Sequence, residues 1–407
     1  MSNERKQSKL DELLRELCPD GVEYKELQEI LKIKNGSDYK AYGEGDIPVY
    51  GSGGIMTYID RYVYNKPSVL IPRKGSIDKL YYVDTPFWNV DTIFYTEINT
   101  DLAMPRYVYH CLLREHLEQY NTAGGVPTLT QKVLNKVQIP LPPLPVQREI
   151  VRILDKFTEL TEALIAELTM ELTARKKQYG CYRDSLLSFA GNTDVKNVPL
   201  SDIAKFVYGY TDKAKETGSV RFVRITDISE DGKLNPYDAK YVELTEESKK
   251  YLLEKGDLLL ARTGATYGKT LYFEADEPAV YASFLIKIIL DNSVIKNRYY
   301  WHFSKSSLYW EQAERYVSKG GQQQFNTNAV SRVKVPVPSL EVQDKIIYVL
   351  DNFDAICSDL KIGLPAEIEA RKKQYEFYRD ALLTYAATGI INTTDRQTDR
   401  QTDRLKV

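Results

Sequence analysis

Apolar residues recur every three or four positions along two long stretches of this chain. The first stretch runs through Ile150, Leu154, Phe157, Leu160, Leu164, Leu168 and Leu172. The second runs through Ile346, Leu350, Phe353, Ile356, Leu360, Leu364 and Ile368. This spacing is typical of amphipathic helices that bury one apolar stripe. No helix breaker interrupts residues 146–179, so we predict a single helix there, about 50 Å long at about 1.5 Å per residue.

The two predicted long helices are expected to pair with each other. Each carries one apolar stripe, and antiparallel pairing would bury both stripes at once. Gly363 and Pro365 predict a break inside the second helix. The alternative is that each stripe faces the core of a compact domain.

Shorter patterns predict mixed α/β structure in the rest of the chain. Apolar runs predict strands at residues 68–71, 93–95, 257–260 and 285–290. Helical spacing predicts short helices near residues 8–17, 105–119 and 297–316. Turn-forming Asn, Asp and Gly residues separate these elements.

An internal repeat organises the whole chain. Residues 139–190 match residues 335–386 at a constant offset of 196, with 24 identical residues in 52 positions. Arg73 and Gly75 match Arg262 and Gly264 at an offset of 189, and the earliest matches have an offset of 173. The second copy therefore carries 23 extra residues, since 196 − 173 = 23. The chain is thus two copies of one unit, each with a variable part followed by a nearly constant helical part.

The repeat divides the chain into six segments. They are an N-terminal helix that completes the repeat (1–19), a first variable domain (20–138), a central helical segment (139–190), a second variable domain (191–334), a C-terminal helical segment (335–390) and a polar tail (391–407).

The tail repeats the sequence Thr-Asp-Arg-Gln from Thr394 onward, which is typical of a disordered segment. The codons CAG ACA GAC AGA spell Gln-Thr-Asp-Arg, so a CAGA repeat in the gene would produce this period. We hypothesise that slippage in such a tract shifts the reading frame after the last helix, which is a form of phase variation. Codons without a four-base period would contradict this hypothesis and leave an inert tail.

Composition excludes several classes of protein. Apolar residues make up 43% and charged residues 28%, which is ordinary for a globular protein, and the net charge is −2. No run of eighteen apolar residues predicts a membrane span, and the charged first seventeen residues do not resemble a signal peptide. The four cysteines are scattered, which argues against disulfides and zinc and favours the cytoplasm.

Three segments resemble known catalytic or binding motifs, but each lacks a residue or a spacing that its motif requires. The segment from Gly264 to Thr270 is one residue short of a phosphate-binding loop. The segment from Asn235 to Tyr237 lacks the second proline of an amino-methyltransferase motif. His110, Cys111 and His116 lack the spacing of a zinc site, and the three histidines of the chain support no catalytic triad. We predict structural histidines, no catalytic centre and no metal site.

What remains is a recognition signal that occurs in both variable domains. An arginine and a glycine follow an apolar strand at residues 71–76 and again at 260–265, an arrangement that suits phosphate or guanine. A Gly-Gly loop then leads into a short helix in each domain, at residues 124–130 and 320–328. The glutamines and asparagines of the second loop suit adenine edges. Thr130 and Thr327 can instead be helix N-caps, and each turn can simply be solvated.

These loops supply the candidate DNA contacts. In the first domain they are Tyr50, Ser52, Arg73, Lys74, Ser76 and Thr128. In the second they are Arg224, Thr226, Arg262, Thr263, Tyr267, Lys269, Gln322, Gln323, Gln324, Asn326 and Asn328. Residues 22–140 hold 13 basic and 14 acidic side chains, and residues 195–336 hold 21 and 18. Because affinity for DNA grows with the number of phosphates neutralised, we expect other subunits to supply many of the contacts to the phosphate backbone.

The doubled motifs resemble those of the specificity subunit of a type I restriction-modification system. They are Ile/Val-Pro-Leu/Val-Pro-x-Leu-x-Val-Gln at residues 139–147 and 335–343, and Ala-Arg-Lys-Lys-Gln-Tyr-x-x-Tyr-Arg-Asp-x-Leu-Leu at 174–187 and 370–383. Residues 19–24, 47–52 and 262–265 add to the resemblance, which covers residues 8–390.

The resemblance implies an α/β (α+β) fold with two globular target recognition domains, separated by an antiparallel pair of long conserved helices in a pseudo-twofold internal repeat. Each domain would read one half of a split site in double-stranded DNA. The helices would set the spacing and dock two modification (methyltransferase) subunits, and restriction (motor-nuclease) subunits would join them. The implied docking residues are Arg175, Lys176, Lys177, Tyr179, Arg371, Lys372, Lys373 and Tyr375.

The same resemblance implies that this chain is not an enzyme and holds no cofactor. S-adenosylmethionine, ATP and Mg are expected on the partner subunits. Three alternatives remain: a coiled-coil scaffold that does not bind DNA, a part of a methyltransferase system without restriction, and a fused nuclease or methyltransferase. The last would need a catalytic motif.

Overall fold

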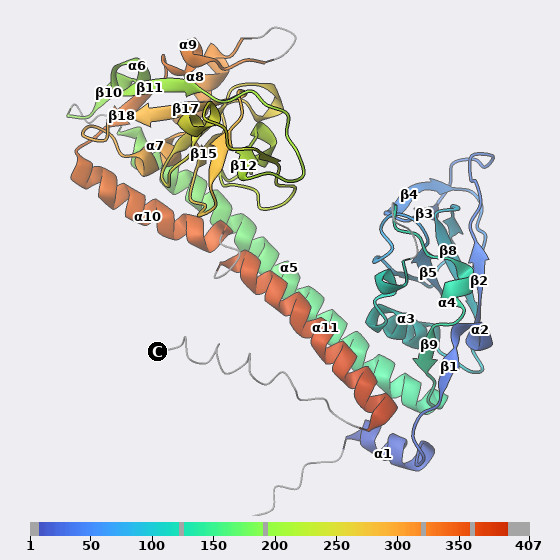
Figure 1. Ribbon diagram of the computed structural model, residues 1–407. Coiled ribbons are helices and arrows are strands. Elements are labelled where there is room, and N and C mark those ends of the chain that lie inside the picture. Colours follow the sequence, from blue (N-terminus) through green and yellow to red (C-terminus); the bar gives the residue numbers. More distant parts are fainter. Residues whose placement is uncertain (1–7, 122–125, 190–193, 319–322, 359–362, 390–407) are drawn as a thin grey trace, which may run out of the picture. The chain divides into compact units, whose positions relative to one another are not determined.

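The computed structural model describes residues 8–121, 126–189, 194–318, 323–358 and 363–389 (Figure 1). Several predicted features lie outside these residues, namely Gln322, both Gly-Gly pairs, Leu360 and the tail at 391–407. The chain forms two compact units. Unit 1 comprises Met1–Ile165 and Glu369–Val407, and unit 2 comprises Ala166–Ile368.

Unit 1 contains a four-stranded, a three-stranded and a two-stranded sheet. The four-stranded sheet has the order β2 (Leu31–Asn35), β8 (Ile93–Ile98), β5 (Ser68–Pro72), β6 (Tyr81–Val83), and its paired strands are antiparallel. The three-stranded sheet has the order β4 (Gly54–Ile59), β3 (Ile47–Gly51), β7 (Trp88–Asn89). The remaining short elements are β1 (Tyr24–Glu26), which pairs with β9 (Gln138–Pro140), and the helices α2 (Leu27–Ile30), α3 (Pro105–Arg114) and α4 (Gln131–Leu134).

Unit 2 repeats this topology strand for strand. Its four-stranded sheet has the order β11 (Ala204–Tyr208), β17 (Leu285–Leu290), β14 (Leu258–Ala261), β15 (Thr270–Tyr272). Its three-stranded sheet has the order β13 (Tyr241–Val242), β12 (Val220–Val223), β16 (Ala279–Tyr281). The remaining elements are β10 (Lys196–Pro199), which pairs with β18 (Lys334–Val337), and the helices α6 (Leu200–Ile203), α7 (Asn297–Phe303), α8 (Ser307–Tyr316) and α9 (Thr327–Val330). The duplication therefore extends through the variable domains, where few residues match.

The structure confirms the predicted strands and refines two helices. Strands β5, β8, β14 and β17 lie where apolar runs predicted them. The helix predicted near 297–316 is two helices, because the Ser306 side chain caps α8 by accepting a hydrogen bond from the Tyr309 amide. The helix predicted near 105–119 ends at Arg114, and a 3-10 helix (Leu117–Tyr120) follows His116, whose φ is 45°.

The long helices follow the apolar stripes. Helix α5 (Leu144–Ser188) is 45 residues long and, as predicted, continuous. The second stretch forms α10 (Leu340–Ser358) and α11 (Leu364–Thr388), so the break predicted at Gly363 and Pro365 is confirmed. Pro365 is the second residue of α11, where a missing amide proton costs no hydrogen bond.

The helices pair in antiparallel fashion within each unit. In unit 1 the Phe157 ring of α5 stacks on Tyr378 of α11, with centroids 6.1 Å apart, and the Thr158 hydroxyl lies 2.8 Å from the Tyr375 hydroxyl. In unit 2 the Tyr182 ring of α5 stacks on Phe353 of α10 at 5.3 Å. Figure 1 shows α11 beside α5 in unit 1 and α10 beside α5 in unit 2.

The predicted N-terminal helix is α1 (Lys9–Leu17), which Ser8 caps. Its Leu10 is buried in the same apolar cluster as Leu383 and Ala386 of α11, and the Tyr385 hydroxyl donates a hydrogen bond to Asp11. The first helix of the chain thus packs against the C-terminal end of the last helix, α11. Over the described residues, no helix combines the length and apolarity needed to cross a membrane.

Candidate nucleic-acid interface

In unit 1 the arginine turn, residues 73–75, follows β5 and is held by the residues that precede α4. The Arg73 carbonyl accepts a hydrogen bond from the Leu129 amide at 2.9 Å. The Gly75 amide donates to the Pro127 carbonyl at 3.1 Å. Gly75 has a φ of 80°, a conformation that glycine adopts without strain. The structure thus brings together two loops that the sequence singled out separately.

Unit 2 holds its arginine turn, residues 262–264, with the same two bonds. The Arg262 carbonyl accepts from the Phe325 amide at 2.7 Å. The Gly264 amide donates to the Gln323 carbonyl at 3.3 Å, and Gly264 has a φ of 70°. The four residues stand at the offsets of 189 and 196 found in the repeat. The two turns are therefore matched in structure as well as in sequence.

The two arginines meet different surroundings. The Arg73 guanidinium lies over the Phe94 ring at 5.2 Å, and its Nε is buried without a hydrogen-bond partner in the described part of the chain. Arg262 donates from Nε to the Ser283 carbonyl at 3.2 Å. Its guanidinium lies 5.4 Å from the ring centroids of both Tyr208 and Phe284.

The β3–β4 hairpin adjoins the turn of unit 1. A Cβ added to Gly75 would lie 3.6 Å from the Ser52 Oγ, and the Tyr81 hydroxyl donates to the Ser52 carbonyl at 3.2 Å. Tyr50 packs against Tyr81 at 5.9 Å. A hollow of about 730 Å³ opens here, lined by residues that include Ser52, Gly53, Val90, Asp91 and Thr92. The candidates Tyr50, Ser52 and Arg73 therefore share one region.

The remaining candidates of unit 1 lie in the same region. Lys74 is exposed on the arginine turn, and Ser76, the residue after the turn, is half-buried. Thr128 pairs with Lys74 through an isolated β-bridge, and its hydroxyl donates to the Val126 carbonyl at 3.0 Å.

In unit 2 some candidates gather at the turn. Thr263 is buried, and its hydroxyl donates to the Gln323 carbonyl at 3.3 Å. Tyr267 packs against Trp310 at 6.0 Å. Gln323 and Gln324 are exposed. Asn328 is exposed on α9, and Thr226 is exposed on a 3-10 helix (Ile225–Asp227).

Arg224 and Lys269, two further candidates, form ion pairs inside unit 2. The Arg224 Nη2 lies 2.7 Å from the Asp227 Oδ1 and 3.3 Å from the Asp238 Oδ2. The Lys269 Nζ lies 2.5 Å from the Glu230 Oε1. Ion pairs with exposed carboxylates are weak, so both residues stay candidate DNA contacts.

The N-cap alternative is settled residue by residue. Thr130 is the N-cap of α4, as that alternative predicted, and its side chain accepts from the Val133 amide at 3.4 Å. For Thr327 the alternative is wrong, because Thr327 is the first residue of α9 and Asn326 is the N-cap. The Asn326 carbonyl oxygen accepts from the Ala329 amide at 3.1 Å, so that side-chain oxygen is occupied.

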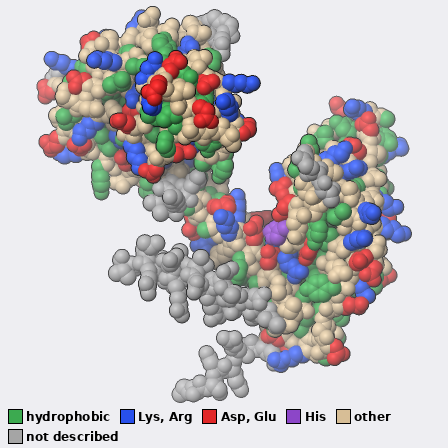
Figure 2. Space-filling model, viewed as in Figure 1, with side chains coloured by type: hydrophobic (Ala, Val, Ile, Leu, Met, Phe, Trp, Pro, Cys, Tyr) green, Lys and Arg blue, Asp and Glu red, His purple; other side chains and the backbone are tan. Residues whose placement is uncertain are grey.

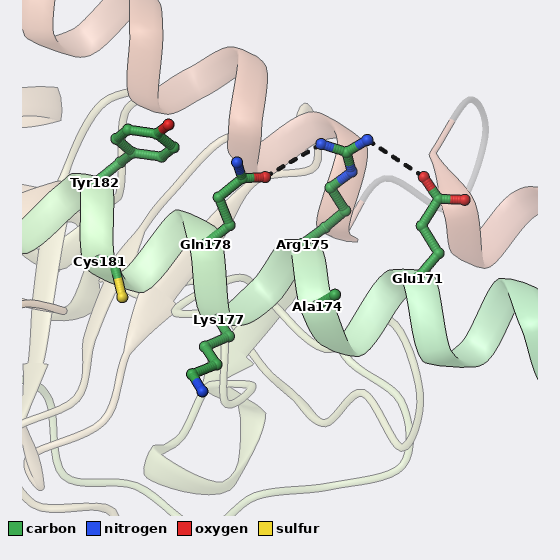
Figure 3. Close-up of a pocket in the computed structure, with 7 residues that line it drawn as sticks. All are labelled: Glu171, Ala174, Arg175, Lys177, Gln178, Cys181 and Tyr182. Carbon is green, nitrogen blue, oxygen red and sulfur yellow. Dashed lines mark hydrogen bonds and ion pairs between the residues drawn. The ribbon is translucent and has the colours of Figure 1, made fainter.

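The candidate docking residues do not share one environment. Arg175, Lys176 and Lys177 are exposed on α5, as are Lys372 and Lys373 on α11, where Arg371 is half-buried. Figure 3 shows Arg175 between Gln178 and Glu171, with Nη atoms 3.1 and 3.4 Å from their side-chain oxygens, beside a shallow hollow that Cys181 and Tyr182 also line.

Tyr179 differs from the other candidate docking residues of α5. Its side chain is buried, and its hydroxyl lies 3.1 Å from the His302 Nδ1. It therefore fastens α5 to the globular part of unit 2, and its role in docking stays a prediction. Tyr375, its counterpart, is half-buried against Thr158.

Sequence reasoning missed the joint between each globular part and its helix. The buried Gln147 accepts from the Met104 amide at 2.8 Å and donates to the carbonyls of Leu102 and Pro142 at 2.9 and 2.8 Å. Gln343 repeats all three bonds in unit 2, with Lys296, Val294 and Pro338 at 2.9, 3.0 and 3.0 Å. The doubled Val-Gln pair was the available signal.

Two of the histidines belong to the same joint, which confirms that they are structural. The His110 Nε2 lies 3.3 Å from Asp155, and the His302 Nε2 lies 2.8 Å from Asp351. Burial lowers the pKa of both imidazoles from 6.5 to about 4. Both are therefore neutral at pH 7 and donate to the carboxylate.

The described residues include no group of three or more His, Cys, Asp or Glu side chains that could hold a metal ion. Basic and acidic side chains are interspersed on the visible face of each unit (Figure 2). The surface of each unit thus offers no broad basic field in this view.

Two homologous domains, each with an arginine turn at one end of a sheet and each joined to a long helix by a buried glutamine, define a duplicated recognition protein. The chain matches the family of the type I restriction modification DNA specificity domain twice, over residues 19–174 and 192–370. It belongs to this family and is a type I specificity subunit.

Two relatives agree with this assignment, and a solved structure has a similar fold. A type I restriction enzyme specificity subunit of Haemophilus influenzae is 32% identical over 386 residues, which cover 90% of this chain and 96% of the relative. One from Escherichia coli is 31% identical over 309 residues, which cover 71% and 73%. A chain of a solved type I restriction-modification system has a similar fold, with a TM-score of 0.62 and 16% identity over 91% of this chain and 98% of that one.

Proposed function

We propose that each globular domain reads one half of a split site in double-stranded DNA, with the arginine turn at the contact. The observation that carries this proposal is the matched turn. Identical backbone bonds hold residues 73–75 and 262–264, whereas the surrounding side chains differ. A shared frame with different side chains is what two readers of different sequences require.

The proposal assigns the chemistry to other subunits. The long helices dock two modification subunits and set the spacing of the half-sites, and restriction subunits join that complex. S-adenosylmethionine, ATP and Mg are held by those partners, in the cytoplasm. The isolated chain, incubated with labelled S-adenosylmethionine and DNA, is expected to transfer no methyl group; measurable transfer would favour the fused methyltransferase.

A domain exchange tests the reading itself. Residues 22–138 are replaced by those of a relative, the complex is expressed with its modification subunits, and methylated sites are mapped by long-read sequencing. We expect one half of the site to change. The matched control exchanges residues 195–336 and should change the other half. A change in both halves from either exchange contradicts modular reading, and a complex that protects no split sequence in footprinting is a scaffold.

A further inference from the structure

Three neighbouring strands end beside each arginine turn. In unit 1 the register pairs Asn35 of β2 with Phe94 of β8, and Pro72 of β5 with Ile93 of β8. Asn35, Thr92 and Arg73 therefore lie at one end of the sheet, on adjacent strands. The Arg73 amide donates to the Thr92 carbonyl at 2.9 Å, which fixes their proximity.

Unit 2 keeps the arginine and places two different residues at the other two positions. There Tyr208 pairs with Ile286, and Ala261 pairs with Leu285. Tyr208, Phe284 and Arg262 therefore occupy the end of this sheet, and the Arg262 amide donates to the Phe284 carbonyl at 3.1 Å.

A residue at the start of the following short helix completes each set. In unit 1 the Gln131 Nε2 donates to the Asn35 Oδ1 at 3.1 Å. In unit 2 the Tyr208 hydroxyl lies 3.2 Å from the Thr327 Oγ1. The offsets of 173 and 196 make these the same pair of positions. Each unit thus has a set of four matched positions: 35, 73, 92 and 131 in unit 1, and 208, 262, 284 and 327 in unit 2.

The two sets present different chemistry. The bond between Gln131 and Asn35 uses one donor and one acceptor, so the pair still offers an amide NH₂ from Asn35 and a carbonyl oxygen from Gln131. Adenine presents the complementary pair in the major groove, an acceptor at N7 and a donor at N6.

The set of unit 2 is aromatic. The side chains of Tyr208 and Phe284 are 41% and 51% exposed, although both adjoin the Arg262 guanidinium. Exposed rings beside an arginine suit an apolar group next to a hydrogen-bonding base. In the major groove that apolar group is the methyl of thymine, and the arginine suits guanine.

Building on the proposed function, we infer that these four matched positions determine the sequence read by each domain. Unit 1 reads an adenine through the Asn35–Gln131 pair. Unit 2 reads a thymine methyl through Phe284 and Tyr208, beside a guanine bound by Arg262.

The test uses the full chain in complex with its modification subunits, with binding measured on variants of the methylated site. The double variant Asn35→Ala with Gln131→Ala should lose discrimination at one adenine position by about tenfold or more and leave the other half-site unchanged. Gln119→Ala removes an exposed amide elsewhere in unit 1 and is the matched control; it should change neither half-site. Equal unfolding midpoints establish that each variant is folded.

Deoxyuridine, which lacks the methyl group of thymidine, tests unit 2. Replacing one thymidine in the half-site of unit 2 should weaken binding several-fold for the parent complex and not for Phe284→Ala. If no thymidine replacement distinguishes the two, or if Asn35→Ala with Gln131→Ala alters both half-sites or neither, the inference is wrong. The domain exchange separates the cases: if it still changes one half-site, the proposed function stands although these positions do not carry it.

Discussion

Single buried side chains fix each globular part to its helix. Gln147 and Gln343 each satisfy one amide and two carbonyls that no regular element pairs. A buried backbone group without a hydrogen-bond partner costs free energy. These two glutamines therefore contribute more to the stability of the fold than exposed glutamines do.

Replacing one of these glutamines should destabilise its own unit. We expect Gln147→Ala to lower the free energy of unfolding by about 2–5 kcal/mol. The substitution leaves three polar backbone groups without a partner, at a cost of about 1–3 kcal/mol each, and water can hydrogen-bond to some of them. Urea unfolding measures this, with Gln119→Ala as the exposed control. Equal effects of the two substitutions would mean that the buried bonds contribute little.

The two buried histidines predict a pH dependence of stability. Their pKa is lowered from 6.5 to about 4 in the folded protein, so the unfolded chain binds more protons between these values. Their contribution to stability is therefore fully present above about pH 6.5 and is lost as the pH falls toward 4. Urea unfolding of His110→Gln with His302→Gln should show a smaller loss between about pH 7 and pH 5 than the parent.

An exposed side chain that does not titrate supplies the control for this series. Gln119→Ala removes no titratable group, so it should leave the loss of stability on acidification as it is in the parent. A double variant that loses stability with the same slope as the parent would show that other groups dominate.

At the scale of elements, the arginine turns depend on their glycines. Gly264 has a φ of 70° with no atom within 4 Å of an added Cβ, so substitution there costs only backbone strain. We expect Gly264→Ala to lower the free energy of unfolding by about 1–2 kcal/mol and to weaken binding to one half-site.

Gly53 offers a matched comparison, since it also has open space but no positive φ. Gly53→Ala should be neutral or slightly stabilising, because it only restricts the unfolded chain. Thermal unfolding of both variants gives the answer; equal losses of stability would exclude strain at residue 264 as the cause.

The elements were predictable where the signal is local. The sequence predicted a helix over 146–179, and α5 continues to Ser188 because Leu187 and Tyr179 bury enough surface to tolerate Gly180. The strand at 285–290 was predicted from its apolar run alone. Local patterns of this kind need no knowledge of distant residues.

The site was less predictable because its partners are distant in sequence. The pairing of Arg224 with Asp238 spans 14 residues, and the burial of Tyr179 depends on His302, 123 residues away. No local sequence pattern reveals a contact between residues that lie so far apart in the chain. Asn35 and Gln131 were overlooked for the same reason, since 96 residues separate them.

At the scale of the whole molecule, duplication lets one fold carry two different readers. The copies share strand order, the glutamine joint and the turn bonds, whereas the second copy has 23 extra residues and an aromatic set of contacts. A single helix, α5, supplies residues to both units. We therefore expect the length of that helix to determine the distance between the half-sites.

Lengthening the helices should change that distance and nothing else. Seven residues inserted after Leu168 in α5, with seven inserted in α11, add about 10 Å at 1.5 Å per residue and turn the apolar stripe by only about 20°. At about 3.4 Å per base pair, the gap between half-sites should grow by about three base pairs, with both half-sites unchanged. Long-read mapping of methylated sites measures the gap. The same seven residues inserted between Gly43 and Glu44, in an exposed loop of unit 1, are the control. A constant gap in the lengthened protein would mean that the helices do not set the spacing.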